Sequence, residues 1–234
     1  MMNRKLTYMT IDTETCDLEG NVYDVGFTIH DRKGNIELEY NALVKEIFTD
    51  AKKMMGAFYA KKLFTHYAPM LQAGDIEMVP WIEIVSHMDQ MAHCFDVDVV
   101  CAYNLAFDRR VLSQTHKALG YTGKLFSRPM RQLDIWRFAC ETKLSQARYR
   151  KIATSLGWVS EAGNLRTGAE YAYRFCSGDH GFIEDHTALS DARIETRILA
   201  DCFATKKRVP YDDIRDKYAA QPWKIPNTDL VSGC

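Results

Sequence analysis

The feature that most constrains the fold is a compact run of β-branched and small apolar residues, 97–103, that leads directly into an amphipathic helical pattern at residues 107–119. The run lacks the polar and apolar alternation of a half-exposed strand, so we expect a central strand covered on both faces. A strand that leads directly into a helix is a building unit of folds in which helices pack on a β-sheet. The sequence therefore predicts an α/β fold.

Three strand-like segments precede this junction, at residues 6–11, 22–30 and 36–44. The second and third are expected to form a hairpin, because Asp31 and Gly34 between them supply turn geometry. Helical patterns cover four further stretches: residues 45–73, 82–95, 136–176 (as two or three helices) and about 187–203. Strands followed by a β-to-α crossover and a run of helices predict a mixed β-sheet flanked by α-helices.

Length and composition indicate how large a core the protein can bury and in which cellular compartment it is expected. With 234 residues, 47% of them hydrophobic, the chain can bury a sizeable core, and we expect one domain at residues 1–204. Residues 205–234 are expected to form a tail that packs on this domain or extends it. Seven cysteines without a C-x-x-C pair favour reduced thiols, and we find neither a signal peptide nor a long apolar run. We therefore expect a cytoplasmic protein without membrane contact.

The charge balance argues against a global attraction to nucleic acid, because 30 Lys and Arg residues face 31 Asp and Glu residues. Contacts with a polyanion must then be local. One basic segment carries an interleaved aromatic residue: Lys143, Arg148, Tyr149, Arg150 and Lys151. Such a mix suits a single-strand backbone and a stacked base, although a solvated helix face is the simpler interpretation. Other basic pairs, including Lys61 with Lys62, stay unassigned.

Two acidic residues, Asp12 and Glu14, end the first predicted strand. Residues two apart in an extended chain point to the same side, so both carboxylates share one face. Such a pair on an apolar strand is costly unless water solvates it or cations neutralise it. Hard oxygen donors suit Mg²⁺ or Mn²⁺. Taken alone, the pair is more typical of a solvent-exposed strand end than of a cation site.

Two more acidic residues are predicted at helix starts. Asp108 follows the strand at residues 97–103, where it can cap the next helix, join a ligand site at the strand ends, or do both. In one continuous helix, His186 and Asp191 would lie about 140° apart around the axis. With Thr187 as N-cap, His186 instead stays on the preceding loop and Asp191 enters the first helical turn.

These residues resemble, in order, the three motifs of the DEDD exonuclease superfamily, at residues 12–15, 104–108 and 186–192. The histidine in the third motif is similar to that of the DEDDh subgroup, which includes ribonuclease T and the proofreading exonuclease subunit of bacterial replicative polymerases. Residues 23–26 and 133–134 resemble secondary landmarks of the family. The likeness spans roughly residues 6–204 and implies a ribonuclease H-like fold with an exonuclease domain.

The resemblance also implies a mechanism, in which two Mg²⁺ (or Mn²⁺) ions support 3′→5′ hydrolysis to nucleoside 5′-monophosphates. Asp12 would bridge both ions. Glu14 and Asp191 would support the ion that carries the attacking water, and Asp108 would hold the ion at the leaving group. His186 would act as the general base, since an imidazole can accept a proton near neutral pH.

Five residues in or next to these motifs are candidate substrate contacts: Thr13, Thr15, Leu18, Asn104 and Phe107. Leu18 is available as the apolar wedge that the family often uses against a base. The family commonly continues its first motif with Thr-Gly-Leu, whereas this chain has Cys16 and Asp17 before Leu18. The added negative charge of Asp17 is expected to alter the loop or the handling of the terminal nucleotide.

The leading functional hypothesis is an exonuclease that prefers single-stranded DNA 3′ ends, in proofreading or repair, with a DNA polymerase or another replication or repair protein as a possible partner. An exoribonuclease that trims RNA would carry the same motifs, because they serve the chemistry and not the sugar. The alternative of another class is an inactive nucleic-acid-binding or scaffold module. The intact set of five catalytic residues argues against it.

Overall fold

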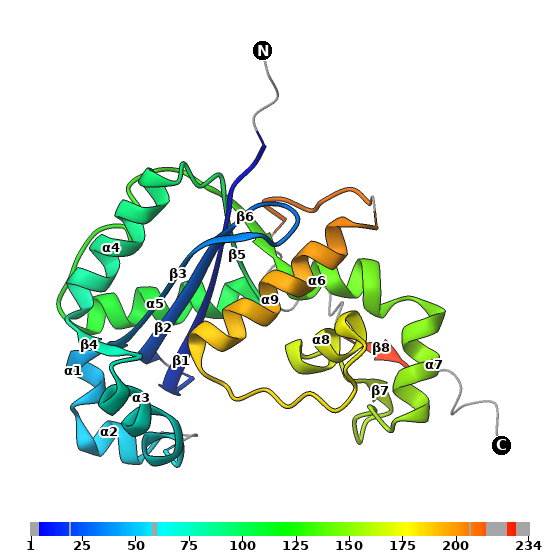
Figure 1. Ribbon diagram of the computed structural model, residues 1–234, viewed down its shortest axis with the longest axis horizontal. Helices are drawn as coiled ribbons and strands as arrows, with labels where there is room; N and C mark the ends of the chain where they lie inside the picture. The colour runs from blue at the N-terminus through cyan, green and yellow to red at the C-terminus, as the bar shows by residue number, and fades with distance from the viewer. Residues whose placement is uncertain (1–4, 19, 58–59, 206, 214–223, 228–234) are drawn as a thin grey trace.

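The computed structural model describes residues 5–18, 20–57, 60–205, 207–213 and 224–227 (Figure 1). Its main sheet has the strand order β4-β3-β2-β1-β5-β6. The bounds are β1 (Tyr8–Asp17), β2 (Gly20–His30), β3 (Ile36–Val44), β4 (Glu77–Val79), β5 (Val99–Ala102) and β6 (Arg131–Asp134). β1, β2 and β3 pair antiparallel, whereas β5 pairs parallel with both β1 and β6, and β4 with β3. The predicted mixed sheet is confirmed.

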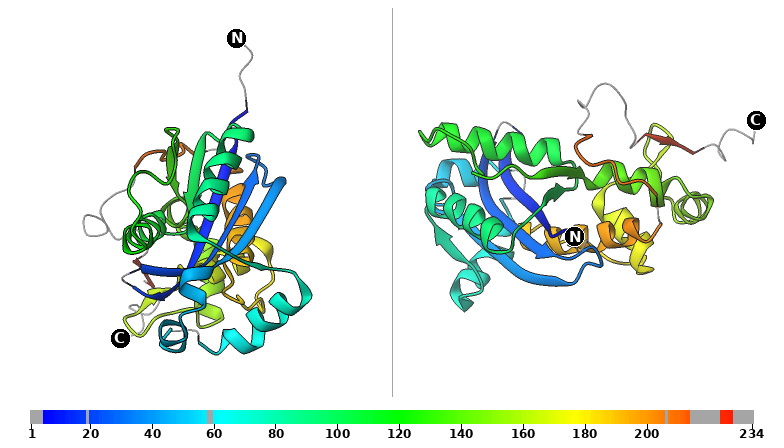
Figure 2. Two further views of the ribbon diagram at one scale, coloured as in Figure 1. Left: turned by 90° about the vertical axis from the view of Figure 1, so that its left-hand side faces the viewer. Right: turned by 90° about the horizontal axis from the view of Figure 1, so that it is seen from above.

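Helices cover both faces of this sheet, and Figure 2 shows α5 and α9 on opposite sides of it. α4 (Trp81–Cys94) and α5 (Leu105–Ala118) pack over one core cluster, which contains Met9 and Ile11 of β1. α9 (Ala188–Phe203) packs over the other cluster, which contains Tyr8 of the same strand. Side chains of a strand alternate between the two faces. β1 therefore contributes to both cores.

The first strand is longer than predicted. It runs to Asp17 because β2 begins at Gly20 and pairs with it along its whole length, with a register shift between Glu14 and Thr15. Asp12 and Glu14 therefore lie inside a paired strand. α5 begins two residues before the predicted start, because Asn104 adopts a left-handed conformation (φ 77°) that turns the chain into the helix.

The predicted helix at residues 45–73 is wrong as a single element. The structure has four short segments instead: α1 (Lys45–Phe48), α2 (Ala51–Met55), the π-helix η1 (Leu63–Tyr67) and α3 (Ala68–Ala73). Asp50 accepts a hydrogen bond from the Lys53 amide at 3.2 Å and so starts a new helix. A side-chain cap of this kind competes with continuation of the preceding turn.

The second half is mainly helical, as predicted. It contains α6 (Ile135–Ala139), the π-helix η2 (Cys140–Leu144), α7 (Ala147–Ser155) and α8 (Ala169–Ser177). Much of the predicted tail lies outside the described residues, but β8 (Ile225–Pro226) pairs with β7 (Asn164–Leu165). Within the described ranges, no helix is long and apolar enough to cross a membrane.

Candidate active site

The face of the sheet that carries Asp12 is fixed by its neighbour in the next strand. Asp12 pairs directly with Gly26 of β2, and directly opposed residues of antiparallel strands point to the same face. A Cβ atom added to Gly26 would lie 2.2 Å from the Leu189 backbone nitrogen. The N-terminus of α9 therefore lies against Gly26, beside Asp12, and only glycine leaves room for it.

The N-terminus of α9 is capped from a distant strand. Asp24 of β2 accepts hydrogen bonds from the Ala188 amide at 3.0 Å and from the Tyr67 hydroxyl at 2.9 Å. Thr187 is the N-cap residue, as predicted, but its own hydroxyl donates to Asp185 at 3.1 Å. The resemblance at residues 23–26 thus has a physical basis, because Asp24 anchors the helix and Gly26 makes space for it.

The predicted break before α9 brings His186 and Asp191 together. His186 has a left-handed backbone (φ 56°) and stays outside the helix, whereas Asp191 lies in the first turn. The His186 Nδ1 atom lies 3.9 Å from an Asp191 oxygen and 3.4 Å from Glu184 Oε2. Ligand atoms of Glu14, His186 and Asp191 all lie within 4.8 Å of one another. Three of the five predicted catalytic residues therefore converge in one cluster.

The carboxyl groups of this site repel one another in a buried setting. Burial raises the pKa of Glu14 to about 7, although the Lys62 ammonium beside it acts in the opposite direction. Burial, and then repulsion from Glu184 and Glu14, raises the pKa of Asp191 to about 9. The pKa of Asp12 lies well above its ordinary value because of burial and of repulsion from Glu195, Asp191 and Asp108. Such a cluster is stabilised by protons or by cations.

Asp108 reaches the site from the first turn of α5. Its Oδ1 atom accepts a hydrogen bond from the Thr13 hydroxyl at 2.9 Å, and both side chains are buried. Burial raises the pKa of Asp108 to about 7, with the Thr13 hydrogen bond acting against that rise. Asp108 is therefore positioned by β1, close enough to raise the pKa of Asp12.

The donor set fits divalent cations. Asp191 Oδ1 is buried and has no hydrogen-bond partner among the residues that the structure describes. Buried polar atoms are rarely left without a partner, and a cation would satisfy this oxygen. The surrounding donors are carboxylates, which hard cations such as Mg²⁺ and Mn²⁺ prefer.

The five predicted substrate contacts differ in how exposed their side chains are. Thr13 is buried and its hydroxyl is engaged by Asp108, whereas Thr15 is half-buried in β1. Leu18, directly after β1, is 60% exposed. Asn104 is the left-handed N-cap residue of α5. Phe107, one turn later, packs against the core with the Arg110 guanidinium 5.2 Å above its ring.

Sequence reasoning missed Lys62. This lysine is only 7% exposed, and its ammonium lies 3.3 Å from Glu14 Oε1. The same ammonium donates to the backbone oxygen of His186. A cation of the protein itself thus offsets part of the acidic charge. Nothing in the local sequence distinguishes Lys62 from its exposed neighbour Lys61.

Sequence reasoning also missed Glu195, a fifth carboxyl group next to the site. It lies one turn after Asp191 on α9, is 2% exposed, and accepts a hydrogen bond from the Tyr103 amide at 3.0 Å. Among the charged neighbours of Asp12, Glu195 is the largest cause of its raised pKa. An acid four residues after Asp191, on the apolar side of the helix, was the available signal.

The interpretation of residues 143–151 as a base-stacking segment is wrong for its aromatic residue. Tyr149 is fully buried, donates a hydrogen bond to the Arg166 carbonyl and packs edge-on against Phe175 at 5.1 Å. Arg150 donates to the Pro226 carbonyl at 2.6 Å. These side chains therefore hold α7 to its own surroundings and leave no exposed ring for a base.

Comparisons with known proteins give a likeness only at the level of structure. The sequence matches no protein-family model and no curated protein. Apo exonuclease I is similar over 87% of this chain and 43% of its own, with 11% identity and a TM-score of 0.55. E. coli exonuclease I in complex with a 5cy-dT13 oligonucleotide gives 12% identity and a TM-score of 0.52, and the match covers 87% of this chain and 41% of that one.

A third similar structure, exonuclease X in complex with 5′ overhanging duplex DNA, gives 18% identity and a TM-score of 0.47. It covers 85% of this chain and 92% of its own, whereas this chain spans less than half the length of exonuclease I. At these identities, the likeness to exonuclease I establishes the fold alone. The α/β architecture, with its mixed sheet and flanking helices, is ribonuclease H-like, as predicted.

Proposed function

We propose that this protein is a divalent-cation-dependent 3′→5′ exonuclease that acts on single-stranded DNA. Two observations at one place carry the proposal: Glu14, His186 and Asp191 converge, and the buried Asp191 Oδ1 atom has no hydrogen-bond partner in the described part of the chain. The likeness to exonuclease I, one structure of which holds a dT13 oligonucleotide, supports DNA as the substrate. The comparisons give no support to a polymerase partner, and the proposal does not include one.

Four carboxylates would hold the cations: Asp12, Glu14, Asp108 and Asp191. When bound, two Mg²⁺ or Mn²⁺ ions would neutralise the phosphate and stabilise the attacking and leaving oxygens. β1 presents Asp12 and Glu14 on the face covered by α9, and the Asp24 cap holds Asp191 against that face. The rigid placement matters, because misplaced ligands lose most of their effect on the transition state.

His186 is the proposed general base. Its side chain is 40% exposed, so water reaches it, and its Nδ1 atom faces Glu184. A proton held on Nδ1 toward Glu184 would put the lone pair of the ring on Nε2, where it could accept the proton of the attacking water. Burial, and then the charge of Lys62, lowers the pKa of His186. The imidazole is thereby kept neutral near pH 7, as a base must be.

The reaction cleaves one phosphodiester bond in each catalytic cycle. The water oxygen forms a bond to phosphorus, the bond from phosphorus to the 3′ oxygen of the penultimate nucleotide breaks, and that oxygen takes up a proton. A nucleoside 5′-monophosphate leaves, and the shortened strand keeps a free 3′ hydroxyl. The exposed Leu18 side chain is the proposed apolar contact for the terminal base, with Asn104 and Phe107 on the α5 side.

The test is a time course on matched 5′-labelled single-stranded DNA and RNA oligonucleotides, with Mg²⁺, Mn²⁺ or a chelator. We expect a descending ladder on DNA that requires the cation. A faster ladder on RNA would favour the exoribonuclease alternative. The absence of a ladder on both substrates, with every cation, would contradict the proposal and favour a binding module.

A further inference from the structure

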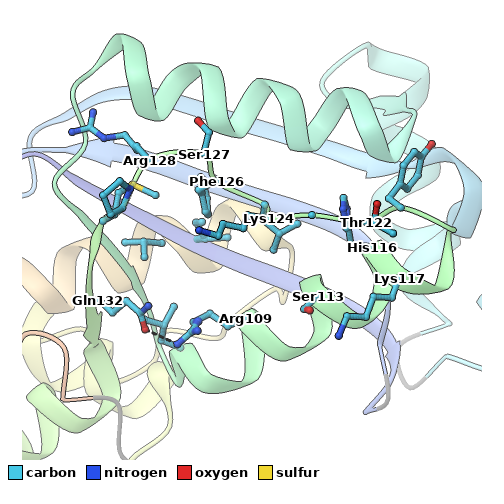
Figure 3. Close-up of a pocket in the computed structure, with 18 residues that line it drawn as sticks. Arg109, Ser113, His116, Lys117, Thr122, Lys124, Phe126, Ser127, Arg128 and Gln132 are labelled. Atoms are coloured by element: carbon cyan, nitrogen blue, oxygen red, sulfur yellow. Dashed lines mark hydrogen bonds between the residues drawn. The ribbon is translucent and has the colours of Figure 1, made fainter.

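A second concave site lies on the other face of the sheet, between α5 and the loop at residues 120–130 (Figure 3). Its volume is about 820 Å³, within the range of small-molecule sites. Apolar side chains from β1, β5, α5 and the loop line its interior: Ile11, Val100, Leu105, Leu125, Phe126 and Met130. Ile11 and Asp12 are adjacent in β1 and point to opposite faces. The sheet therefore separates this cavity from the carboxylate cluster.

One residue of the cavity lining, His116, carries a buried hydrogen-bond donor. His116 is 5% exposed, and its Nδ1 atom accepts a hydrogen bond from the Trp81 indole nitrogen at 3.0 Å. An indole nitrogen can only donate, so Nδ1 carries no proton and the proton of the neutral ring sits on Nε2. His116 Nε2 is buried and has no hydrogen-bond partner within the described part of the chain. Because His116 lines the cavity, an acceptor on a ligand could satisfy this donor.

The rim of the cavity is positively charged. Its lining includes four basic residues and no Asp or Glu: Arg109, Lys117, Lys124 and Arg128. Arg128 is paired with Asp96 at 3.0 Å, and Arg109 donates to Gln132 at 2.5 Å. Lys117 and Lys124 form no ion pair with the residues that the structure describes. Figure 3 shows Lys117 on the α5 side and Lys124 on the loop side, with the Ser113 and Thr122 hydroxyls nearby.

We propose that this cavity binds a small anion that combines a planar ring with a phosphate, which is the chemistry of a mononucleotide. The ring would lie on the apolar lining and accept a hydrogen bond from His116 Nε2. The phosphate would lie between Lys117 and Lys124, whose charges no carboxylate in the lining offsets. This proposal does not rest on the proposed nuclease activity: the cavity lies across the sheet from Asp12, although α5 contributes residues to both sites.

The experiment is a calorimetric titration of the full chain with AMP, adenosine or inorganic phosphate, all in the presence of a chelator. The chelator removes any cation-dependent binding at the carboxylate cluster. We expect saturable one-to-one binding of AMP, at least about tenfold tighter than binding of adenosine or phosphate. The double variant Lys117→Glu/Lys124→Glu should weaken AMP binding by at least about tenfold.

The matched control is Lys33→Glu/Lys151→Glu, which makes the same change in charge at exposed lysines away from the cavity. It should change AMP affinity less than about twofold. In the wild-type chain, ¹⁵N spectra of the histidine rings should show a shift of the His116 Nε2 signal when AMP binds.

Three outcomes of the AMP titrations and spectra would overturn the proposal. They are the absence of saturable AMP binding, equal weakening in the control variant, or an unchanged His116 signal at saturation. Phosphate or adenosine binding as tight as AMP would also overturn it, because the site would then recognise only one half of the ligand. None of these outcomes depends on cleavage of DNA, so the nuclease proposal stands or falls separately.

Discussion

The two faces of the central sheet differ in charge next to the same strand: acids gather on the α9 side, with Asp108 approaching them from the N-terminus of α5, whereas a basic cavity lies farther along the α5 side. On the α9 side, Asp12 and Glu14 lie with Asp191 and Glu195, and the pKa of each is raised above its ordinary value, first by burial. On the α5 side, the cavity beside Ile11 has lysines on its rim and no acid in its lining. The net charge of −1 conceals this separation. Local fields, and not the overall balance, decide which ligands each face attracts.

The largest effect is expected for Asp12→Asn, because this carboxylate lies among the other acids of the α9 face. Loss of one cation ligand should reduce DNA cleavage by about 10⁴-fold, since a bound cation contributes several kcal/mol to transition-state stabilisation. Single-turnover rates on a single-stranded oligonucleotide measure the effect. Glu37→Gln, at an exposed position of β3, is the control and should cleave at the wild-type rate.

His186→Ala should slow cleavage by about 10³-fold while leaving cation binding almost unchanged, because the imidazole acts on the proton and not on the metal. The wild-type rate should fall as the pH drops through the lowered pKa of His186, where the ring gains its proton. Rates measured from pH 5 to 8, together with calorimetry of Mg²⁺ binding, test both points. An unchanged acid limb in the variant would remove His186 from the role of base.

Gly26→Ala tests the close approach of α9 to the sheet. The new Cβ would meet the Leu189 nitrogen at 2.2 Å, so α9 must move or β2 must bend. We expect a loss of about 3 kcal/mol in the free energy of unfolding, measured by urea denaturation. Gly168→Ala is the control, since its Cβ would meet nothing within 4 Å and its backbone has an ordinary φ of −60°. Equal stability of the two variants would argue against the packing account.

Lys62→Met should have the smallest effect and the opposite sign. Its ammonium lies 3.3 Å from Glu14 and competes with a cation for that carboxylate. Removing the charge while keeping an apolar stem should tighten Mg²⁺ binding, by up to about tenfold. Calorimetry in parallel with Lys61→Met, the neighbouring position, separates the two lysines. Weaker Mg²⁺ binding in Lys62→Met would contradict this competition.

The two faces also show which parts of the site the sequence alone can predict. Asp108 and the break between His186 and Asp191 were predictable, because each depends on a helix start, and the shared face of Asp12 and Glu14 was predictable from the alternation of a strand, although that strand continues past both residues. The role of Lys62 was not predictable. Lys62 and Glu14 lie 48 residues apart in the sequence, and Lys62 directly precedes the π-helix η1. The Asp24 cap joins residues 164 apart. Contacts that tertiary packing creates leave no local pattern.

The wrong prediction of an exposed, base-stacking ring at Tyr149 has the same cause. Its sequence neighbours are basic, so the segment looked like a solvated surface with an exposed ring. The helical turn instead points Tyr149 inward against Phe175, while Arg148 and Arg150 stay at the surface side of α7. Glu195 was missed for the opposite reason: it is a polar residue that turns out to be buried. An acid on a buried helix face is stable only where the fold supplies groups that interact with it.

The most direct test of the account compares two aspartates of α9, Asp191 at its N-terminal turn and Asp201 two to three turns later, where it is tied to Arg197 at 3.3 Å. The measurement is the cation-dependent ladder on 5′-labelled single-stranded DNA, with Asp191→Asn and Asp201→Asn beside the wild type. The account predicts that Asp191→Asn loses the ladder and Asp201→Asn keeps it. Undiminished cleavage by Asp191→Asn would contradict the assignment of this face as the catalytic one.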